Sequence, residues 1–307
     1  MAIRFGGSVL DITIDGRELG DAVEVQTYER EVLDQLRRVL DVYGKGQYKT
    51  GRWVMEELSK SLTIRPSLAQ KHDANGQKVV DLQNHPVVIT DLRASAQATD
   101  PSKAVATART FGVRGLGSDV VIRYSPGVWW YVDARRVGVD TSKHCYVQLG
   151  PDERFLLGSD KLASQPDDIL LHELFHAYRQ MNGLWIDDAK DTFDADYGRK
   201  EEFFAVLVTN IYVSERNTSY QPRALRGKYT FKENGTEPIF RDLDNDPQFQ
   251  DPETHHFSTR RFYDRYEGAI DEMVSDMSNT FRNRLASVNA QFNPIALWTA
   301  RHPTGNG

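Results

Sequence analysis

The chain has 307 residues, of which 39% are hydrophobic and 27% charged, and its formal net charge is −6. These values are ordinary for a soluble globular protein of one large or two small domains, and the acidic balance argues against nucleic-acid binding by bulk electrostatics. No apolar run is long enough to cross a membrane, the start of the chain lacks a classical secretory pattern, and the single cysteine, Cys145, excludes an intrachain disulfide.

Helices and strands alternate by pattern in the first half of the chain. Apolar stretches around Asp15-Gly16 predict a hairpin within residues 3–26, and helical spacing predicts helices over 27–42 and 53–62. Residues 94–117 are rich in Ala, Ser, Thr and Gly, and we interpret them as a loop. Strands are expected at 78–82, 86–91, 118–124, 144–149 and 155–157.

The second half of the chain is mostly helical by pattern. Ser164 can cap a strong helix with Pro166 and acidic residues in its first turn, and Asn182-Gly183 end it. The other expected elements are a helix over 199–215, a polar loop over 241–256 and a long helix over 259–290, which Pro294 bars from continuing. This order indicates an α+β fold with a small mixed sheet beside the helix that follows Ser164.

Two histidines on that helix carry the chemistry. His172 and His176 are four residues apart, so both imidazoles lie on one face and can share a zinc ion. Glu173 lies roughly 100° around the helix from His172, where it can accept a proton from a water on the metal and return it to a leaving amine. Chance could produce this spacing, but two histidines among apolar neighbours would be costly to bury without a partner.

A catalytic zinc usually has three protein ligands, so one must come from elsewhere. Glu202 is our choice, with Glu201 as the alternative, because both precede a strongly apolar helical stretch. Both could instead simply favour a helix N-terminus. Tyr197, just before that helix, is the first candidate for stabilising an oxyanion, with Tyr220 and Tyr229 behind it.

Several further residues have a weaker pattern. The strand over 118–124 could bind an extended substrate along a sheet edge, or it could be an inner strand. His255 and His256 lie in the polar loop, where we expect surface residues. The acidic stretch over 186–197 could support a zinc histidine, but its composition is more typical of a solvated loop.

The run LLHELFHAYRQMNG, followed by EEFFAVLVTNIYVSE, resembles the NleD-like type III effector metallopeptidases, bacterial zinc proteases delivered into host cells. This resemblance implies zinc held by His172 and His176, with Glu173 as general base. The piece that begins at Glu202 also resembles the third-ligand helix of anthrax lethal factor, a glutamate zincin. Many glutamate zincins have an acidic residue four positions after this ligand, whereas this chain has Val206.

The resemblance implies a zinc endopeptidase of zincin-like fold that cleaves a protein in a host or competitor cell. Such an effector is made in the bacterial cytoplasm, is secreted with a chaperone as a candidate partner, and acts in the target-cell cytoplasm. We interpret residues 93–307 as the zincin-like catalytic domain and 1–92 as an N-terminal α/β part. The alternative is a non-catalytic protein-binding module with a structural zinc, although such a module has no need of Glu173.

Overall fold

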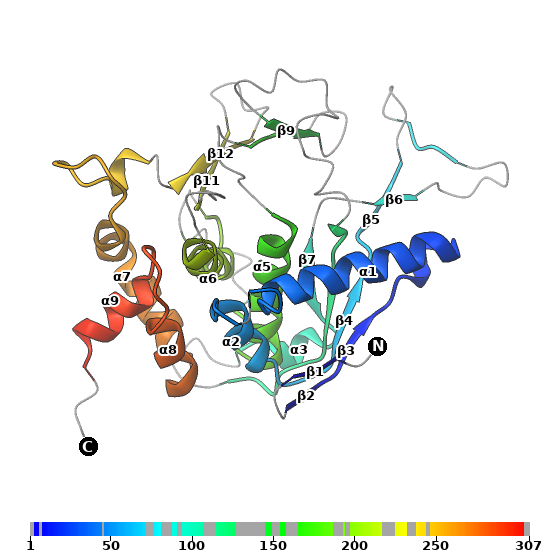
Figure 1. Ribbon diagram of the computed structural model, residues 1–307, viewed down its shortest axis with the longest axis horizontal. Helices are drawn as coiled ribbons and strands as arrows, with labels where there is room; N and C mark the ends of the chain where they lie inside the picture. Colours follow the sequence, from blue (N-terminus) through cyan, green and yellow to red (C-terminus); the bar gives the residue numbers. More distant parts are fainter. Residues whose placement is uncertain are drawn as a thin grey trace.

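The computed structural model describes residues 3–5, 8–44, 46–71, 77–80, 88–90, 94–106, 114–126, 145–148, 154–157, 165–186, 193, 197–216, 225–231, 238–243 and 246–303. Over these residues the chain has a mixed α+β fold (Figure 1), as the order of expected elements indicates. None of the helices in these ranges is both long and apolar enough to span a membrane.

One four-stranded sheet lies beside the helices, in the order β3 (Ile12–Ile14), β4 (Leu62–Arg65), β8 (Val120–Arg123) and β7 (Ser95–Ala98). β3, β4 and β8 are parallel, and β7 pairs antiparallel with β8. Buried residues alternate along the three parallel strands, as expected for a sheet with one face against helices: Ile12, Ile14, Leu62, Ile64, Val120 and Ile122.

The remaining strands form smaller pairings. β1 (Ile3–Phe5) pairs with β2 (Ser8–Leu10), and β5 (Leu68–Gln70) pairs with β6 (Val88–Thr90), both antiparallel. A second four-stranded sheet has the order β11 (Arg226–Phe231), β12 (Pro238–Asp242), β10 (Arg154–Leu157) and β9 (Cys145–Gln148).

Helix α5 (Pro166–Met181) lies at the centre of the fold, and all 16 of its residues are buried. It contacts α1 (Ala22–Val39), α2 (Thr50–Glu56), α6 (Lys200–Arg216) and the strands β7 and β8. A helix enclosed on every side has no solvent face, so its polar residues must find partners inside the protein.

Both ends of α5 are fixed. At its start, the Asp168 carboxylate accepts a hydrogen bond of 3.0 Å from the Gln165 backbone N–H, and the Tyr124 hydroxyl donates one of 2.7 Å to the Pro166 carbonyl. The expected cap, Ser164, lies outside the described residues. At its end, Gly183 has φ +63°, and an added Cβ would lie only 2.3 Å from the Gly115 carbonyl oxygen, so glycine is required there.

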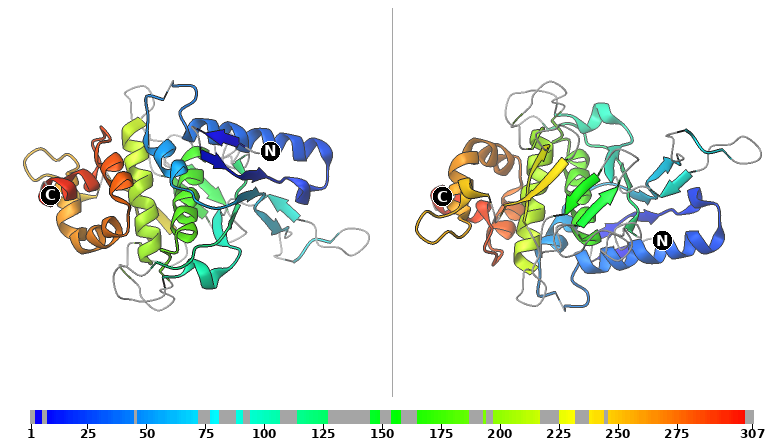
Figure 2. Two further views of the ribbon diagram at one scale, coloured as in Figure 1. Left: turned by 90° about the horizontal axis from the view of Figure 1, so that it is seen from below. Right: turned by 90° about the horizontal axis from the view of Figure 1, so that it is seen from above.

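The helix expected over 259–290 is wrong as a single element. The chain forms α7 (Thr259–Ser275) and α8 (Asn279–Ala286), because Ser278 accepts a hydrogen bond from the Phe281 N–H and begins a new helix. Pro294 starts α9 (Pro294–Arg301), where a missing N–H costs nothing. Figure 2 shows α6 between α5 and these C-terminal helices.

The hairpin expected around Asp15-Gly16 is also wrong. These residues lead from β3 into a short 3-10 helix (Arg17–Leu19), and α1 starts at Ala22 because the Asp21 carboxylate accepts from the Val23 and Glu24 N–H groups. The strand β3 pairs with β4, which is about fifty residues away in the chain, so the local composition could not indicate this pairing.

Two other early elements differ from the prediction. The predicted loop over 94–117 contains β7 and the short helix α3 (Pro101–Ala104), since pairing with β8 overrides a weak local strand propensity. The helix predicted over 53–62 is shifted: α2 begins three residues earlier, because the distant Glu215 carboxylate accepts from the N–H groups of Lys49 and Thr50. It ends at Glu56, and Leu62 already belongs to β4.

The central sheet contains strands from both of the parts into which we divide the chain. β3 and β4 belong to residues 1–92, whereas β7 and β8 belong to 93–307. The boundary at residue 92 stays a proposal, and the shared sheet predicts that the first part does not fold alone.

Candidate metal centre

Helix α5 brings His172 and His176 together on its face toward α6. Their Nε2 atoms lie 3.0 Å apart, and the ring planes are nearly perpendicular at 86°. Both side chains are buried, with exposed fractions of 10% and 5%. Two ring nitrogens this close need a shared proton or a shared cation between them.

Helix α6 contributes the third group, Glu202. Its Oε2 lies 3.2 Å from the Nε2 of His172, and its Oε1 lies 3.5 Å from the Nε2 of His176. One ligand atom from each of the three residues fits within 4.8 Å of the others. Atoms bound about 2.0–2.1 Å from one tetrahedral zinc lie about 3.3 Å from each other, so these separations fit a single ion.

The electrostatics of the cluster favour a cation. Burial by itself lowers the pKa of His176, but the facing carboxylate of Glu202, together with the charges of Glu173 and Glu201, outweighs burial and raises this pKa to about 9. In turn, the two histidines hold the pKa of Glu202 far below its usual range, although burial opposes them. A site that stabilises an imidazolium so strongly also stabilises a metal ion in its place.

Glu173 lies beside this cluster. It is only 5% exposed, and its negative charge is one of the contributions that raise the pKa of His176. It is not one of the three converging groups. Its position therefore suits a carboxylate that exchanges protons near the ion and does not bind it.

The comparison with protein families agrees with this geometry. The family Peptidase M91, described as effector protein, matches residues 66–248, which is more than half of the chain. The chain belongs to this NleD-like metallopeptidase family. The M91 match includes all of α5 and α6, whereas α7, α8 and α9 lie beyond it. No curated protein and no solved structure matches the chain.

Within the M91 match, the two adjacent glutamates have different surroundings. Glu201 is 2% exposed and forms an ion pair of 2.7 Å with Arg179. Glu202 has a half-exposed side chain and faces the histidines. This geometry favours Glu202 over Glu201 as the third ligand.

The other predicted residues are not among the three converging groups, and some of them lie outside the described residues. Tyr197 is buried, with its ring 5.1 Å from that of Phe203 and 5.7 Å from that of Tyr266, and its role stays a prediction. β8 is an inner strand, and β7 ends its sheet among the described strands. His255 and His256 are exposed, as expected. Tyr220, the Tyr229 side chain and most of 186–197 lie outside the described residues.

Three further residues near the centre have no role predicted from the sequence: Arg179, Trp185 and Asp276. The Trp185 ring lies 5.4 Å from the ring of His176. The buried Arg179 forms an ion pair with the partly buried Asp276, with an N···O distance of 3.4 Å. Arg179 belongs to the string that carries the family resemblance, but the sequence alone gave it no role. Nothing in the sequence links it to Asp276, which is far away in the chain.

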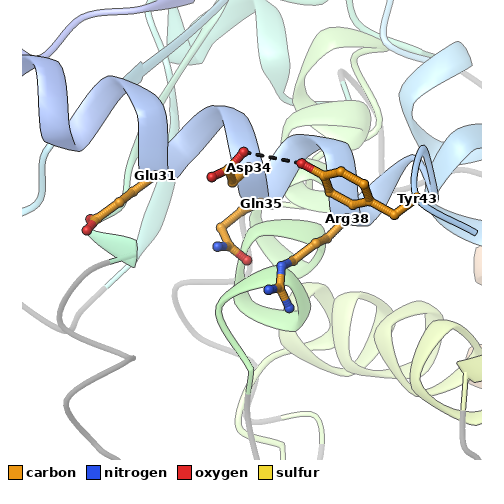
Figure 3. Close-up of a pocket in the computed structure, with 5 residues that line it drawn as sticks. All are labelled: Glu31, Asp34, Gln35, Arg38 and Tyr43. Atoms are coloured by element: carbon orange, nitrogen blue, oxygen red, sulfur yellow. Dashed lines mark hydrogen bonds between the residues drawn. The ribbon is translucent and has the colours of Figure 1, made fainter.

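A pocket of about 180 Å³ lies elsewhere, along the outer part of α1. Figure 3 shows its lining: Glu31, Asp34, Gln35, Arg38 and Tyr43. The Tyr43 hydroxyl donates a hydrogen bond of 3.4 Å to Asp34, so two of the lining residues contact each other. The pocket shares no residue with the histidine cluster.

Proposed function

We propose that this chain is a zinc-dependent endopeptidase in which His172, His176 and Glu202 hold the ion and Glu173 is the general base. The convergence of two imidazoles and a carboxylate within 4.8 Å carries this proposal. Two nitrogen ligands and one carboxylate form the ligand set of several catalytic zinc sites. Membership of a peptidase family supports the same interpretation.

A zinc ion at this site would act as a Lewis acid, polarising the scissile carbonyl and making water easier to deprotonate. Glu173 takes the proton from the attacking water and returns it to the nitrogen of the leaving amine. The half-exposed side of Glu202 leaves the centre open to a substrate. An extended peptide would pair with the edge strand β7, and Tyr197 is our candidate for stabilising the oxyanion.

We further propose a zincin-like catalytic domain and a protein substrate in a host or competitor cell. The description of the family as effector proteins supports secretion from the bacterium and action in the target-cell cytoplasm, with a secretion chaperone as a candidate partner. The mixed α+β fold, with a helix beside a small sheet, agrees with a zincin-like arrangement.

The test compares the wild-type protein with Glu173→Gln, which keeps the size and polarity of the side chain. We expect about one zinc per chain in both proteins, measured by elemental analysis. New peptide termini in a target-cell extract should appear only with the wild type, and a chelator should abolish them. Identical effects of both proteins on the extract would support a binding module with a structural zinc.

A further inference from the structure

Arg179 forms a buried connection between four segments. Its side chain is fully buried on α5, three residues after His176. Its Nε donates to both carboxylate oxygens of Glu201, at 2.7 and 3.0 Å. Its Nη2 donates to the Leu184 carbonyl at 2.7 Å and lies 3.4 Å from the Asp276 carboxylate. The guanidinium thus joins α5, the chain that follows it, α6 and the end of α7.

Glu201 receives a further hydrogen bond that fixes its direction. Its Oε1 accepts from the Ile186 backbone N–H at 2.9 Å. Successive residues on a helix point about 100° apart. A Glu201 side chain held toward Arg179 therefore sets the rotation of α6 that turns Glu202 toward the histidines.

The residues on either side of these glutamates are held by α7. Lys200 donates to Glu272 at 2.8 Å. The Phe203 ring stacks on that of Phe262, with 14° between the planes, and lies 4.9 Å from the Tyr266 ring. The first turn of α6 is thus fixed around Glu202, partly by a helix beyond the family match.

We propose that Arg179 and Glu201 are positioning residues that hold Glu202 in place for the metal ion, with Asp276 as a supporting partner from α7. The inference rests on the proposed function, since it takes Glu202 as a metal ligand. Buried ion pairs are often no more stabilising than apolar residues of similar size, and their best-attested use is to fix one arrangement. A fixed rotation of α6 is such an arrangement.

The test uses the double variant Arg179→Met with Glu201→Gln, since either single change leaves a buried charge and can prevent folding. The double variant removes both charges, and the introduced glutamine side chain can still accept the Ile186 N–H. We expect the metal-free double variant to fold, with an unfolding temperature moderately below that of the wild type because the Leu184 carbonyl and Asp276 lose the guanidinium. Its zinc dissociation constant should rise about 10- to 100-fold, as for other residues that orient metal ligands. Competition with a chelator measures that constant.

A spectroscopic measurement separates positioning from general loosening. Bound Co²⁺ in the wild type should give an intense visible spectrum typical of four ligands, and the double variant should give a weaker, shifted one. Asp276→Asn should change both readouts in the same direction by less. The matched control is the remote surface pair, Arg284→Met with Glu56→Gln, which should change neither.

The outcomes distinguish the two proposals. A wild-type protein that binds neither zinc nor Co²⁺ at these residues contradicts the proposed function and the positioning role together. A wild type that binds zinc beside a folded double variant with the same affinity and spectrum overturns the positioning role alone.

Discussion

Two clusters built by the same pair of helices have opposite characters. Helices α5 and α6 contribute Arg179 and Glu201 to one, where opposite charges neutralise each other away from water. They contribute His172, His176 and Glu202 to the other, where one side is half exposed and a cation fits among the ligands. The first is complete within the protein, whereas we propose that a metal ion completes the second.

The comparison shows that identical residue types at adjacent positions can have different roles. Glu201 and Glu202 differ in direction by one step of the helix, and that step decides between a salt bridge and the proposed metal site. Variants in the two clusters should therefore fail differently. Changes at the metal cluster should abolish chemistry or binding in a folded protein, whereas changes at the ion pair should act first on stability.

The largest effect is expected from Glu173→Gln. Loss of a general base lowers turnover by about 10²- to 10⁴-fold, while zinc content and unfolding temperature should stay near those of the wild type. Initial rates on a cleaved target protein, together with metal analysis, measure this. A variant with wild-type turnover would require a different proton acceptor.

The next effect is on stability, from Arg179→Met alone. This change leaves the buried Glu201 without its cation and should cost about 3–5 kcal/mol of unfolding free energy, as measured in urea. Adding Glu201→Gln should recover much of this loss. The exposed pair Arg284–Glu56 should contribute about 0–1 kcal/mol by the same method. Equal losses at the two pairs would remove the contrast between buried and exposed charges.

A smaller free-energy effect is expected from Glu202→Ala. Loss of a direct ligand should weaken zinc binding by more than about 100-fold, beyond the range typical of residues that only orient ligands. Chelator competition should give this variant a lower zinc affinity than the double variant at Arg179 and Glu201. The opposite ranking would move the ligand assignment to Glu201.

The sequence indicated the local parts of this centre well. The spacing of His172 and His176 depends only on helix geometry, and the helix itself has clear start and stop residues. The choice between Glu201 and Glu202 could not be settled, because it depends on how α6 is rotated against α5. That rotation depends on Arg179 and α7, and no local pattern records those contacts.

Three elements of the fold illustrate which features a local pattern predicts. The strand β7 has a loop-like composition and becomes a strand through its pairing with β8. The break between α7 and α8 depends on capping by Ser278 within a sequence that looks continuously helical. The strand β8 was predicted within one or two residues, since its apolar run is long enough to be recognised locally. The strand β7, which depends on a distant partner, was missed, and so was the local cap at Ser278, whereas the long apolar run of β8 was found.

A third charged cluster, around Asp15, is intermediate in burial between the two clusters formed by α5 and α6. Asp15 is buried, but its main partner Arg17 has an 83% exposed side chain. Hydrogen bonds from Arg17 lower the pKa of Asp15 from 3.8 to about 2, against the opposing effect of burial, and Arg65 assists. A lowered pKa means that the ionised carboxylate stabilises the fold above about pH 4 and loses this contribution as the pH falls toward 2.

The smallest predicted effect therefore comes from Asp15→Asn. Because solvent screens Arg17, this change should cost only about 1 kcal/mol at pH 7. Urea unfolding of both proteins at several pH values should show this difference shrinking to about half near pH 3. If the difference in unfolding free energy between the two proteins stays constant with pH, Asp15 acts through its hydrogen bonds alone. Partial exposure of an ion pair would then be enough to remove the electrostatic contribution that we assign to the buried pair of Arg179 and Glu201.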